Sequence, residues 1–411
     1  MSEASGRGFT TLRDPEFKKL SVLIATALID MLGFAIVFPL LPFYTLQLKA
    51  PPVAVGWIIA AFSLAQIASA PIWGKFSDRR GRRPALLVGM FASGIAFLVF
   101  GFATSVWVLL LSRVIQGAGG GTTGVLHAYV GDAIPPERRA QALGWISAAT
   151  NVGVAVGPII GSFAFKFGTA VPGVVAAALC FLNLLFTWRW LPESRSFTPA
   201  SGVPRPRPAV AGALLSVVTH PRTLVSRLVW VYGAGMLGFS AMTSVFALFL
   251  GDRFGVTSAN VGYFFAYTGA LNFLMRAVAL GPIVRRLGEV GAIRLGTVAL
   301  VTGLVLYPLV PSLLILPLVM PLIPIGTALI FPSTTAMISK ASDPLILGTT
   351  MGVAQSFAGG ARVLAPLIST AVFQRYGASM PFYLAAGIVA GVGLLAFRLP
   401  ESAGRLAQAK N

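Results

Sequence analysis

The sequence predicts an all-α membrane protein whose twelve transmembrane helices form two pseudo-symmetric six-helix bundles. Three observations support this fold class: an apolar composition, twelve long apolar stretches, and a second half that repeats the first. Of the 411 residues, 56% are hydrophobic and 10% are charged, whereas soluble domains carry about 25% charged residues. This composition excludes a soluble domain and a disordered chain. The single cysteine, Cys180, excludes an internal disulfide framework and a cysteine-based metal centre.

Twelve apolar stretches are long enough to cross a bilayer, whose core requires about 20 residues of helix. We expect these spans at 20–44, 53–74, 85–104, 106–130, 140–165, 169–191, 224–250, 258–281, 291–311, 313–338, 348–373 and 380–398. The first span is expected to stay uncleaved, because its apolar run continues to Tyr44. The long connector at 192–223 contains the run PRPRP at 204–208, which favours an extended, solvated linker. It separates the bundles predicted at 1–191 and 224–411.

The two halves repeat each other with an offset of 205 to 208 residues. The matching positions are, in chain order, MLGF at 31–34 and 236–239, Gly56 and Gly262, Pro158 and Pro366, and LPES at 191–194 and 399–402. Six spans are an even number, so both halves enter the membrane from the same side. Such a parallel repeat places the substrate site where the halves meet, near mid-depth.

The net charge of +19 is explained by membrane topology. With the N-terminus in the cytoplasm, 22 of the 31 Lys and Arg residues fall in cytoplasmic segments and 4 fall on the opposite side. Basic residues are retained in cytoplasmic loops, so we expect a multi-pass protein of the plasma (inner) membrane with both termini cytoplasmic. Because topology accounts for the basic excess, no nucleic-acid partner is expected.

The connector between the second and third spans reads GKFSDRRGRR at 74–83. Its glycines permit close packing and a tight turn, and its acid can face a helix N-terminus or an arginine. The string closely resembles the signature loop of the major facilitator superfamily, G-x-x-x-D-R-x-G-R-R. The residues that match are Gly74, Asp78, Arg79, Gly81, Arg82 and Arg83. The resemblance covers residues 20–402 and implies the fold of that superfamily.

The fourth span contains Arg113 seven residues into an apolar run, SRVIQGAGGG at 112–121. An arginine at that depth costs roughly 2.5–3.5 kcal/mol on insertion scales, so it should have a partner or a task. The segment resembles the R-x-x-Q-G string of proton-coupled members of the superfamily, in which the arginine is tied to proton coupling. The resemblance therefore assigns proton coupling to Arg113.

Gly153, Gly157 and Gly161 recur every four residues in the fifth span and line one helix face, and Pro158 adds a bend. Close packing of small residues is one interpretation. The pattern G-x-x-x-G-P-x-x-G also resembles the element characteristic of the drug:proton antiporter branch, whose members export their substrates.

The first span reads LIDMLGFAIVFPLLP at 28–42, which resembles the opening of tetracycline-type and related multidrug effluxers with twelve spans. Tetracycline effluxers carry further acids in spans three and nine. The corresponding stretches here, 85–104 and 291–311, contain none. Tetracycline itself and a proton path of several acids are therefore not indicated.

Asp30 is the only acid deep within a predicted span. At 1.5 Å per residue it lies about 15 Å from the cytoplasmic start, whereas Arg113 lies roughly 10 Å from the opposite face. In a core of about 30 Å their depths differ by only about 5 Å, and the superfamily fold places spans one and four side by side. We expect Asp30 and Arg113 to pair and to exchange a proton as access alternates. A purely structural buried pair is the alternative.

Two more arginines, Arg276 and Arg362, lie within spans eight and eleven without an obvious acidic partner. Three arginines against one acid give the cavity a positive bias, which favours an anionic or polar substrate. The residues expected to line the substrate cavity are Phe34, Gln116, Tyr232, Phe239, Tyr263, Tyr267, Arg276 and Arg362.

A second charged segment follows the fourth span and is expected on the cytoplasmic side, where Asp132 and Arg138 lie close to Glu137 and Arg139. We expect ion pairs between this segment and the 74–83 loop that hold the outward-facing state.

The sequence thus predicts a secondary active transporter, not an enzyme, that exports small amphipathic compounds in exchange for protons by alternating access. The alternative within the same fold is a symporter or antiporter of an organic anion or a sugar-like metabolite. The sequence contains no P-loop string and no metal-ligating cluster, so we expect no metal and no cofactor, with the proton gradient as energy source. The expected partners are the substrate, protons and the lipid bilayer, and the chain is expected to be a monomer.

Overall fold

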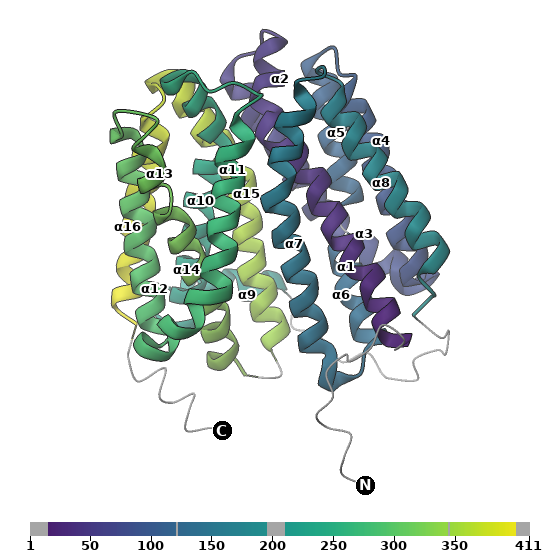
Figure 1. Cartoon of the computed structure of the whole chain (residues 1–411). Coiled ribbons are helices and arrows are strands. Elements are labelled where there is room, and N and C mark those ends of the chain that lie inside the picture. The colour runs from purple at the N-terminus through teal and green to yellow at the C-terminus, as the bar shows by residue number, and fades with distance from the viewer. Residues whose placement is uncertain (1–14, 121, 195–209, 344–345, 400–411) are drawn as a thin grey trace. The chain divides into compact units, whose positions relative to one another are not determined.

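The computed structural model describes residues 15–120, 122–194, 210–343 and 346–399. Every regular element in these ranges is a helix, and the long helices coincide with the predicted spans (Figure 1). The prediction of an all-α membrane protein is therefore confirmed.

The first repeat is built from nine helical elements. They are α1 (Pro15–Val37), η1 (Phe38–Leu40), α2 (Leu41–Gln47), α3 (Pro52–Arg80), α4 (Arg82–Gly101), α5 (Val106–Gly119), α6 (Thr122–Ala133), α7 (Pro136–Phe165) and α8 (Val171–Trp190). Pro39 follows the end of α1 and begins a short 3₁₀ turn, as expected of a residue without a backbone N–H. Gly81 separates α3 from α4 with a φ of 104°, a conformation that favours glycine.

The connector and the second repeat form ten further elements. They are α9 (Val210–Thr219), α10 (Leu224–Phe254), α11 (Val261–Leu274), η2 (Met275–Ala279), α12 (Leu280–Leu306), η3 (Tyr307–Leu309), α13 (Leu316–Val319), α14 (Leu322–Ala341), α15 (Leu347–Tyr376) and α16 (Met380–Phe397). A single residue of η2 is charged, Arg276. Within α12, Gly288 has φ 69° and ψ 173°, which breaks the helix where the connector between spans eight and nine was predicted.

Ten helices in the described ranges are long and apolar enough to cross a membrane. One of them, Val261–Leu309, has 49 residues and is long enough for two crossings, because it continues through Gly288. The fourth predicted span, 106–130, is divided between α5 and α6 on either side of residue 121, so neither piece reaches the length of a span. The ten candidates are therefore consistent with the twelve predicted spans.

The contacts divide the chain into two compact units, each composed mainly of one repeat. The first unit takes 257–267 from the second repeat, and the second unit takes 49–60 from the first repeat. In the first unit, α1 packs against α7 and α8, and α4 packs against α5 and α8. In the second unit, α10 packs against α15 and α16, and α12 packs against α14. The domain boundaries proposed from the sequence stay a prediction.

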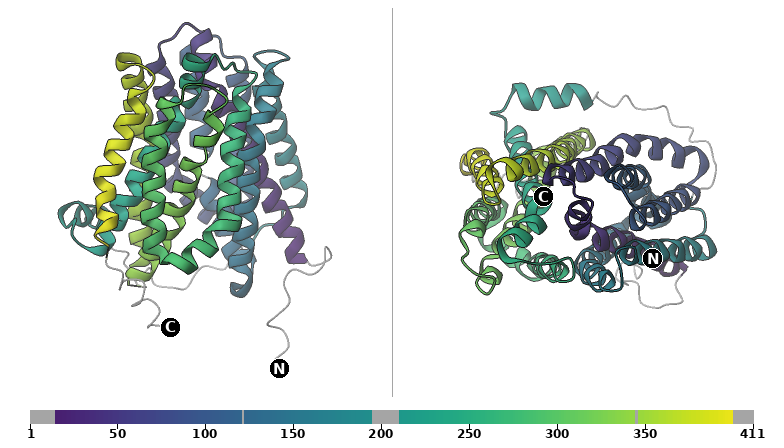
Figure 2. Two further views of the ribbon diagram at one scale, coloured as in Figure 1. Left: turned by 60° about the vertical axis from the view of Figure 1, so that its left-hand side comes forward. Right: turned by 90° about the horizontal axis from the view of Figure 1, so that it is seen from above.

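The connector at 192–223 differs in part from its prediction as an extended linker. Its residues 210–219 form α9, which lies crosswise to the long helices and packs against α10 and α15 (Figure 2). The prediction is wrong for this stretch, because the run VAGALLSVV contains no proline and has an apolar surface to bury. The PRPRP run at 204–208 lies outside the described residues.

Candidate functional site

Asp30 lies on a polar strip between α1 and α8 of the first unit. Its side chain is partly buried, and its carboxylate interacts electrostatically with the Cys180 thiol of α8. One turn earlier on α1, the buried Thr26 hydroxyl lies 3.2 Å from the Thr187 hydroxyl and 3.5 Å from Asn183 Oδ1. Thr26 and Asp30 are four residues apart and share a helix face. The strip therefore surrounds an acid with neutral polar groups.

Arg113 is enclosed in α5 with only 2% of its surface exposed. Its guanidinium carbon lies 5.0 Å from the ring centroid of Phe100 and 5.8 Å from that of Phe97. Its Nε–H donates to the Ser112 hydroxyl at 3.4 Å, while Nη2 has no hydrogen-bond partner among the described residues. Aromatic faces attract such a cation, and they hold Arg113 in place.

The structure does not bring Asp30 and Arg113 into an ion pair, because no such pair within 4.0 Å occurs between these two described residues. Phe97 links their surroundings instead. Besides contacting Arg113, its ring packs on α1, where a Cβ atom at Gly33 would lie 2.9 Å from Phe97 Cε2. Gln116, one turn after Arg113, is 4% exposed, and its Oε1 has no partner among the described residues.

Phe34 belongs to an aromatic cluster in the first unit. Its ring centroid lies 5.3 Å from those of Phe38 and Phe62, and Phe38 lies 6.2 Å from Phe265. Phe265 belongs to α11 and to the segment that joins the first unit. Sequence reasoning did not single out Phe62 or Phe265, because aromatic residues are common in spans and these two follow no motif.

The remaining predicted cavity residues include a cluster in the second unit. Tyr232 of α10 is 7% exposed and interacts electrostatically with both Arg276 of η2 and Arg362 of α15. The Gln355 amide donates to the Tyr232 hydroxyl at 3.4 Å. The cluster brings together three residues that the sequence placed in separate spans, and it adds Gln355.

The other predicted aromatic residues are more dispersed. Tyr263 and Tyr267 are 50% and 38% exposed on α11, and Phe239 is partly buried in α10. Tyr263 and Tyr267 belong to the segment that joins the first unit, whereas Phe239 and Tyr232 belong to the second unit.

The 74–83 segment, predicted as a loop, is helical except at Gly81, because α3 continues to Arg80 and α4 begins at Arg82. Its charged side chains form a network centred on Arg82. The Arg82 guanidinium lies 2.8 Å from Asp78 Oδ1, 2.9 Å from Asp132 Oδ2 and 2.6 Å from the Ser77 hydroxyl. The ion pair to Asp132 joins the loop to the end of α6, as the sequence predicts. Arg79 is exposed at the end of α3, and Gly74 has open space around its Cβ direction.

Glu193 is a residue of this network that sequence reasoning missed. Its carboxylate accepts the backbone N–H groups of Arg82 at 2.9 Å and Arg83 at 3.1 Å, at the positive end of α4. A Cβ atom at Gly81 would lie 2.5 Å from Glu193 Oε2, so this glycine gives the carboxylate its room. The signal was available, since Glu193 belongs to the LPES string that marks the repeat.

The glycines of α7 pack on α1. A Cβ atom at Gly153 would lie 2.7 Å from Leu28 O, and one at Gly157 would lie 2.6 Å from Ala35 Cβ. A Cβ atom at Gly161 would lie 2.2 Å from Ile36 O. Each is closer than real Cβ contacts allow, so the helices can approach only where these side chains are absent.

Pro158 and its repeat partner Pro366 each meet a glycine. Within the first unit, a Cβ atom at Gly262 would lie 2.0 Å from the Pro158 carbonyl oxygen. Ser162 secures this contact by accepting the Gly262 N–H at 2.8 Å and donating to the Ser258 carbonyl at 2.7 Å. Within the second unit, a Cβ atom at Gly56 would lie 2.6 Å from the Pro366 carbonyl oxygen.

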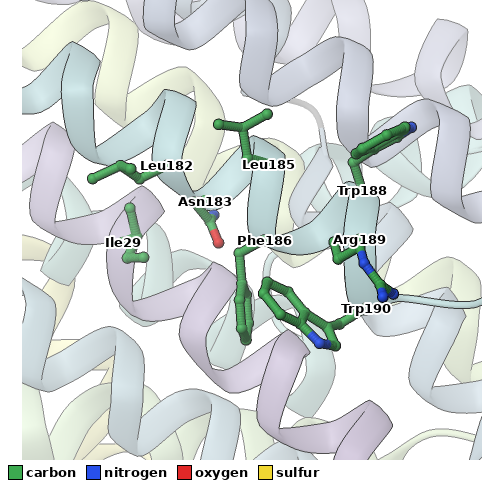
Figure 3. Close-up of a pocket in the computed structure, with 8 residues that line it drawn as sticks. All are labelled: Ile29, Leu182, Asn183, Leu185, Phe186, Trp188, Arg189 and Trp190. Carbon is green, nitrogen blue, oxygen red and sulfur yellow. The ribbon is translucent and has the colours of Figure 1, made fainter.

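A groove of about 540 Å³ lies along α8, apart from the charged clusters (Figure 3). Its lining residues are mostly apolar and comprise Ile29, Leu182, Asn183, Leu185, Phe186, Trp188, Arg189 and Trp190. Tryptophan and arginine gather at membrane–water interfaces, so the groove marks the interfacial end of α8.

The family model of the Major Facilitator Superfamily matches residues 23–327. The chain belongs to this superfamily. Its resemblance to drug-efflux members is confirmed by relatives along nearly the whole chain. Tetracycline resistance protein, class C, from Escherichia coli is 30% identical over 93% of this chain and 95% of its own length. Multidrug resistance protein 2 from Bacillus subtilis is 26% identical over 91% of this chain and 92% of its own length.

A solved structure shows the same superfamily fold. The crystal structure of the human organic anion transporter MFSD10 (TETRAN) matches with a TM-score of 0.67 at 24% identity, over 93% of this chain and 100% of that chain. At this identity the match establishes the fold alone. The family, the relatives and the apolar helices together identify a multi-pass membrane transporter rather than an enzyme.

Proposed function

We propose that this chain exports small amphipathic compounds in exchange for protons by alternating access. One observation carries the proposal: Asp30 is an acid within a span, on the polar strip between α1 and α8. The names of the relatives, which are resistance proteins, support export as the direction.

Asp30 suits proton exchange because the free-energy cost of holding its carboxyl group in the membrane differs between the ionised and the neutral form. An ionised carboxylate without a cationic partner is costly in a membrane bundle, whereas the neutral acid is not. Access to water lowers that cost, so opening of the cavity governs when the proton leaves. Arg113 shares Phe97 with the Asp30 turn, so a helix movement that brings Arg113 closer to Asp30 would supply the positive charge that favours release.

The other predicted groups take supporting roles in this cycle. The Arg82 network of α3, α4 and α6 holds one state closed on the cytoplasmic side, and the α7 glycines let α1 move as a unit with α7. The protein acts as a monomer in the plasma (inner) membrane with both termini cytoplasmic. The proton gradient is its energy source and it needs no cofactor.

The proposal is tested by transport in liposomes under an imposed pH gradient, with ethidium, chloramphenicol and fluorescein as cationic, neutral and anionic probes. The wild-type protein should move at least one probe against its concentration gradient as protons flow the other way. The variant Asp30→Asn should reduce this flux to that of protein-free liposomes, because an amide cannot release a proton. Exchange driven by a probe gradient alone should persist.

The matched control is Asp252→Asn, which neutralises an exposed acid near the end of α10. It should retain pH-driven transport. Undiminished pH-driven transport in Asp30→Asn would disprove the proposed coupling, and loss of probe-driven exchange as well would indicate a structural role for Asp30.

A second candidate function, transport of an organic anion or a sugar-like metabolite, is favoured by the arginines of the second unit. Arg276 and Arg362 both interact with Tyr232. In the pH-gradient assay, this function would appear as accumulation driven in the direction of proton flow, or as transport of a sugar-like probe added to the assay.

A further inference from the structure

Two arginines converge on one tyrosine in the second unit. Tyr232 lies on α10, Arg276 on η2 and Arg362 on α15, and both guanidinium groups lie within electrostatic range of the Tyr232 side chain. Helices α10 and α15 pack directly against each other. Three helical segments far apart in sequence therefore present two positive charges and a hydroxyl to one place.

The local helix geometry at Arg276 is unusual. Met275–Ala279 forms a π-helical turn between α11 and α12, and Arg276 is its charged residue. Such turns are rare and occur frequently at functional sites, because the wider turn redirects side chains. Arg276 remains exposed and Arg362 is partly buried, so both guanidinium groups keep surface available for a ligand.

Among the residues that the structure describes, no acid forms an ion pair with this cluster. The acids that the structure describes in the second repeat are Asp252, Glu289 and Asp343, and all three lie at helix ends or connectors. Glu289 pairs with Lys340 at 2.5 Å. No ion pair within 4.0 Å joins Arg276 or Arg362 to an acid in the described ranges. Arg362 Nε–H donates to the Ala358 carbonyl at 3.4 Å, which leaves the other guanidinium donors for a partner of a different origin.

The neighbours of the cluster are suited to an amphipathic molecule. Gln355 lies seven residues before Arg362, on the same face of α15. Its amide donates to the Tyr232 oxygen at 3.4 Å, so the Tyr232 hydrogen can be donated elsewhere. The ring of Phe331 meets Tyr232 edge to face with centroids 5.3 Å apart. Hydrogen-bond donors thus lie next to an aromatic surface.

We propose that Arg276, Arg362 and Tyr232 form an anion subsite that binds the carboxylate or another acidic group of an amphipathic substrate. Guanidinium groups bind carboxylates through paired, charge-assisted hydrogen bonds, and the adjacent aromatic surface holds the apolar part of the substrate. The inference rests on the proposed transport function, and it names the charge of the compounds that this transporter selects.

The test measures binding of two xanthene dyes to purified protein in lipid nanodiscs without a pH gradient. Fluorescein carries negative charge and rhodamine 6G carries positive charge on a similar ring system. Fluorescence anisotropy, corrected for empty nanodiscs, should show that wild-type protein binds fluorescein. Arg276→Gln and Arg362→Gln should each weaken fluorescein binding by about 10-fold or more, the range expected for hydrogen bonds to charged groups. Rhodamine 6G binding should not weaken.

Three further variants separate the subsite from general structural effects. Arg362→Lys should retain part of the fluorescein affinity, and Tyr232→Phe should lower it by about threefold, as expected for one hydrogen bond. Arg375→Gln changes an arginine in the last turn of the same helix and should have no effect. Absence of fluorescein binding by the wild type, or equal loss of both dyes in the arginine variants, would overturn the subsite. Because no proton gradient is used, neither result depends on Asp30.

Discussion

Equivalent positions of the two repeats form the same backbone contact yet carry different charges. Gly262 and Gly56 correspond in the repeat, and each lies against the carbonyl of a corresponding proline, Pro158 or Pro366. The charges show no such correspondence. Asp30 precedes the MLGF string of the first repeat, where the second repeat has Gly235.

This difference separates what the fold requires from what the function requires. A helix that approaches a carbonyl to within contact distance needs glycine in either repeat, because any Cβ would collide. A charge within a membrane span has no such structural reason, and placing it there costs free energy. The unmatched charges, Asp30 in the first repeat and Arg276 and Arg362 in the second, are therefore the residues to which we assign proton exchange and substrate recognition.

The shared glycine contact should be the most sensitive feature of the fold. In Gly262→Ala the new Cβ would lie 2.0 Å from the backbone oxygen of Pro158, and Ser162 would lose its hydrogen bond if α11 moved away. We expect a loss of about 1–3 kcal/mol in stability, typical of overpacking, and strongly reduced transport. Thermal unfolding followed by tryptophan fluorescence measures the first effect.

Gly56→Ala should be destabilising to a smaller extent, because the new Cβ would lie 2.6 Å from the Pro366 carbonyl oxygen, compared with 2.0 Å for Gly262 and Pro158, and the Thr370 hydroxyl at 2.1 Å can turn away. Gly281→Ala is the matched control, since nothing lies within 4 Å of a Cβ there. An unchanged Tm for Gly262→Ala would show that α11 shifts freely and that this contact does not limit the fold.

The fold could be predicted from the sequence because its signals are long and repeated. Each predicted span exceeds the length that a bilayer demands, and each coincides with a helix or a pair of helices. Interruptions were harder to predict. The π-helical turn at Met275–Ala279 and the short helix α9 depend on packing against neighbouring helices, which no local pattern records.

The sequence predicted which residues form the candidate site, but not which residues they contact. Arg113 stood out as a charge in an apolar run, yet its neighbours Phe97 and Phe100 belong to α4 and carry no motif. The sequence indicated Tyr232 only as one of several aromatic residues within spans. Its proximity to two arginines depends on the tertiary structure. The sequence shows which charged residues lie within spans. The packing of the helices determines which residues contact them.

Arg113 provides the second way to sharpen the comparison between the repeats. Arg113→Leu removes a buried cation that has no acidic partner among the described residues, so we expect the Tm to stay constant or rise, as when buried charges are replaced by apolar groups. The pH-driven flux should fall by about tenfold, equivalent to roughly 1.4 kcal/mol of lost interaction with the Asp30 cycle.

Arg113→Lys serves as the control that keeps the charge but loses the planar stacking on Phe97 and Phe100. It should retain more flux than Arg113→Leu. Equal activity of the leucine variant and the wild type would remove Arg113 from the coupling mechanism and leave Asp30 alone in that role.

The smallest effects are expected at the charged helix ends of the two repeats, which differ in how their basic residues are paired. Arg82 binds both Asp78 and Asp132 in the first repeat, whereas in the described part of the second repeat Lys340 pairs with Glu289. Asp78 is 58% exposed, and exposed pairs contribute about 0–1 kcal/mol. Asp78→Ala should therefore slow transport by about two- to fivefold, with substrate binding unchanged, because the network stabilises one conformation without touching substrate.

Glu289→Ala should change the rate by less than about twofold, since its pair is not part of a network. Parallel measurements of initial flux and dye binding in both variants would show whether the Arg82 network controls the conformational cycle. Equal loss of binding and flux in Asp78→Ala would instead assign this loop to folding.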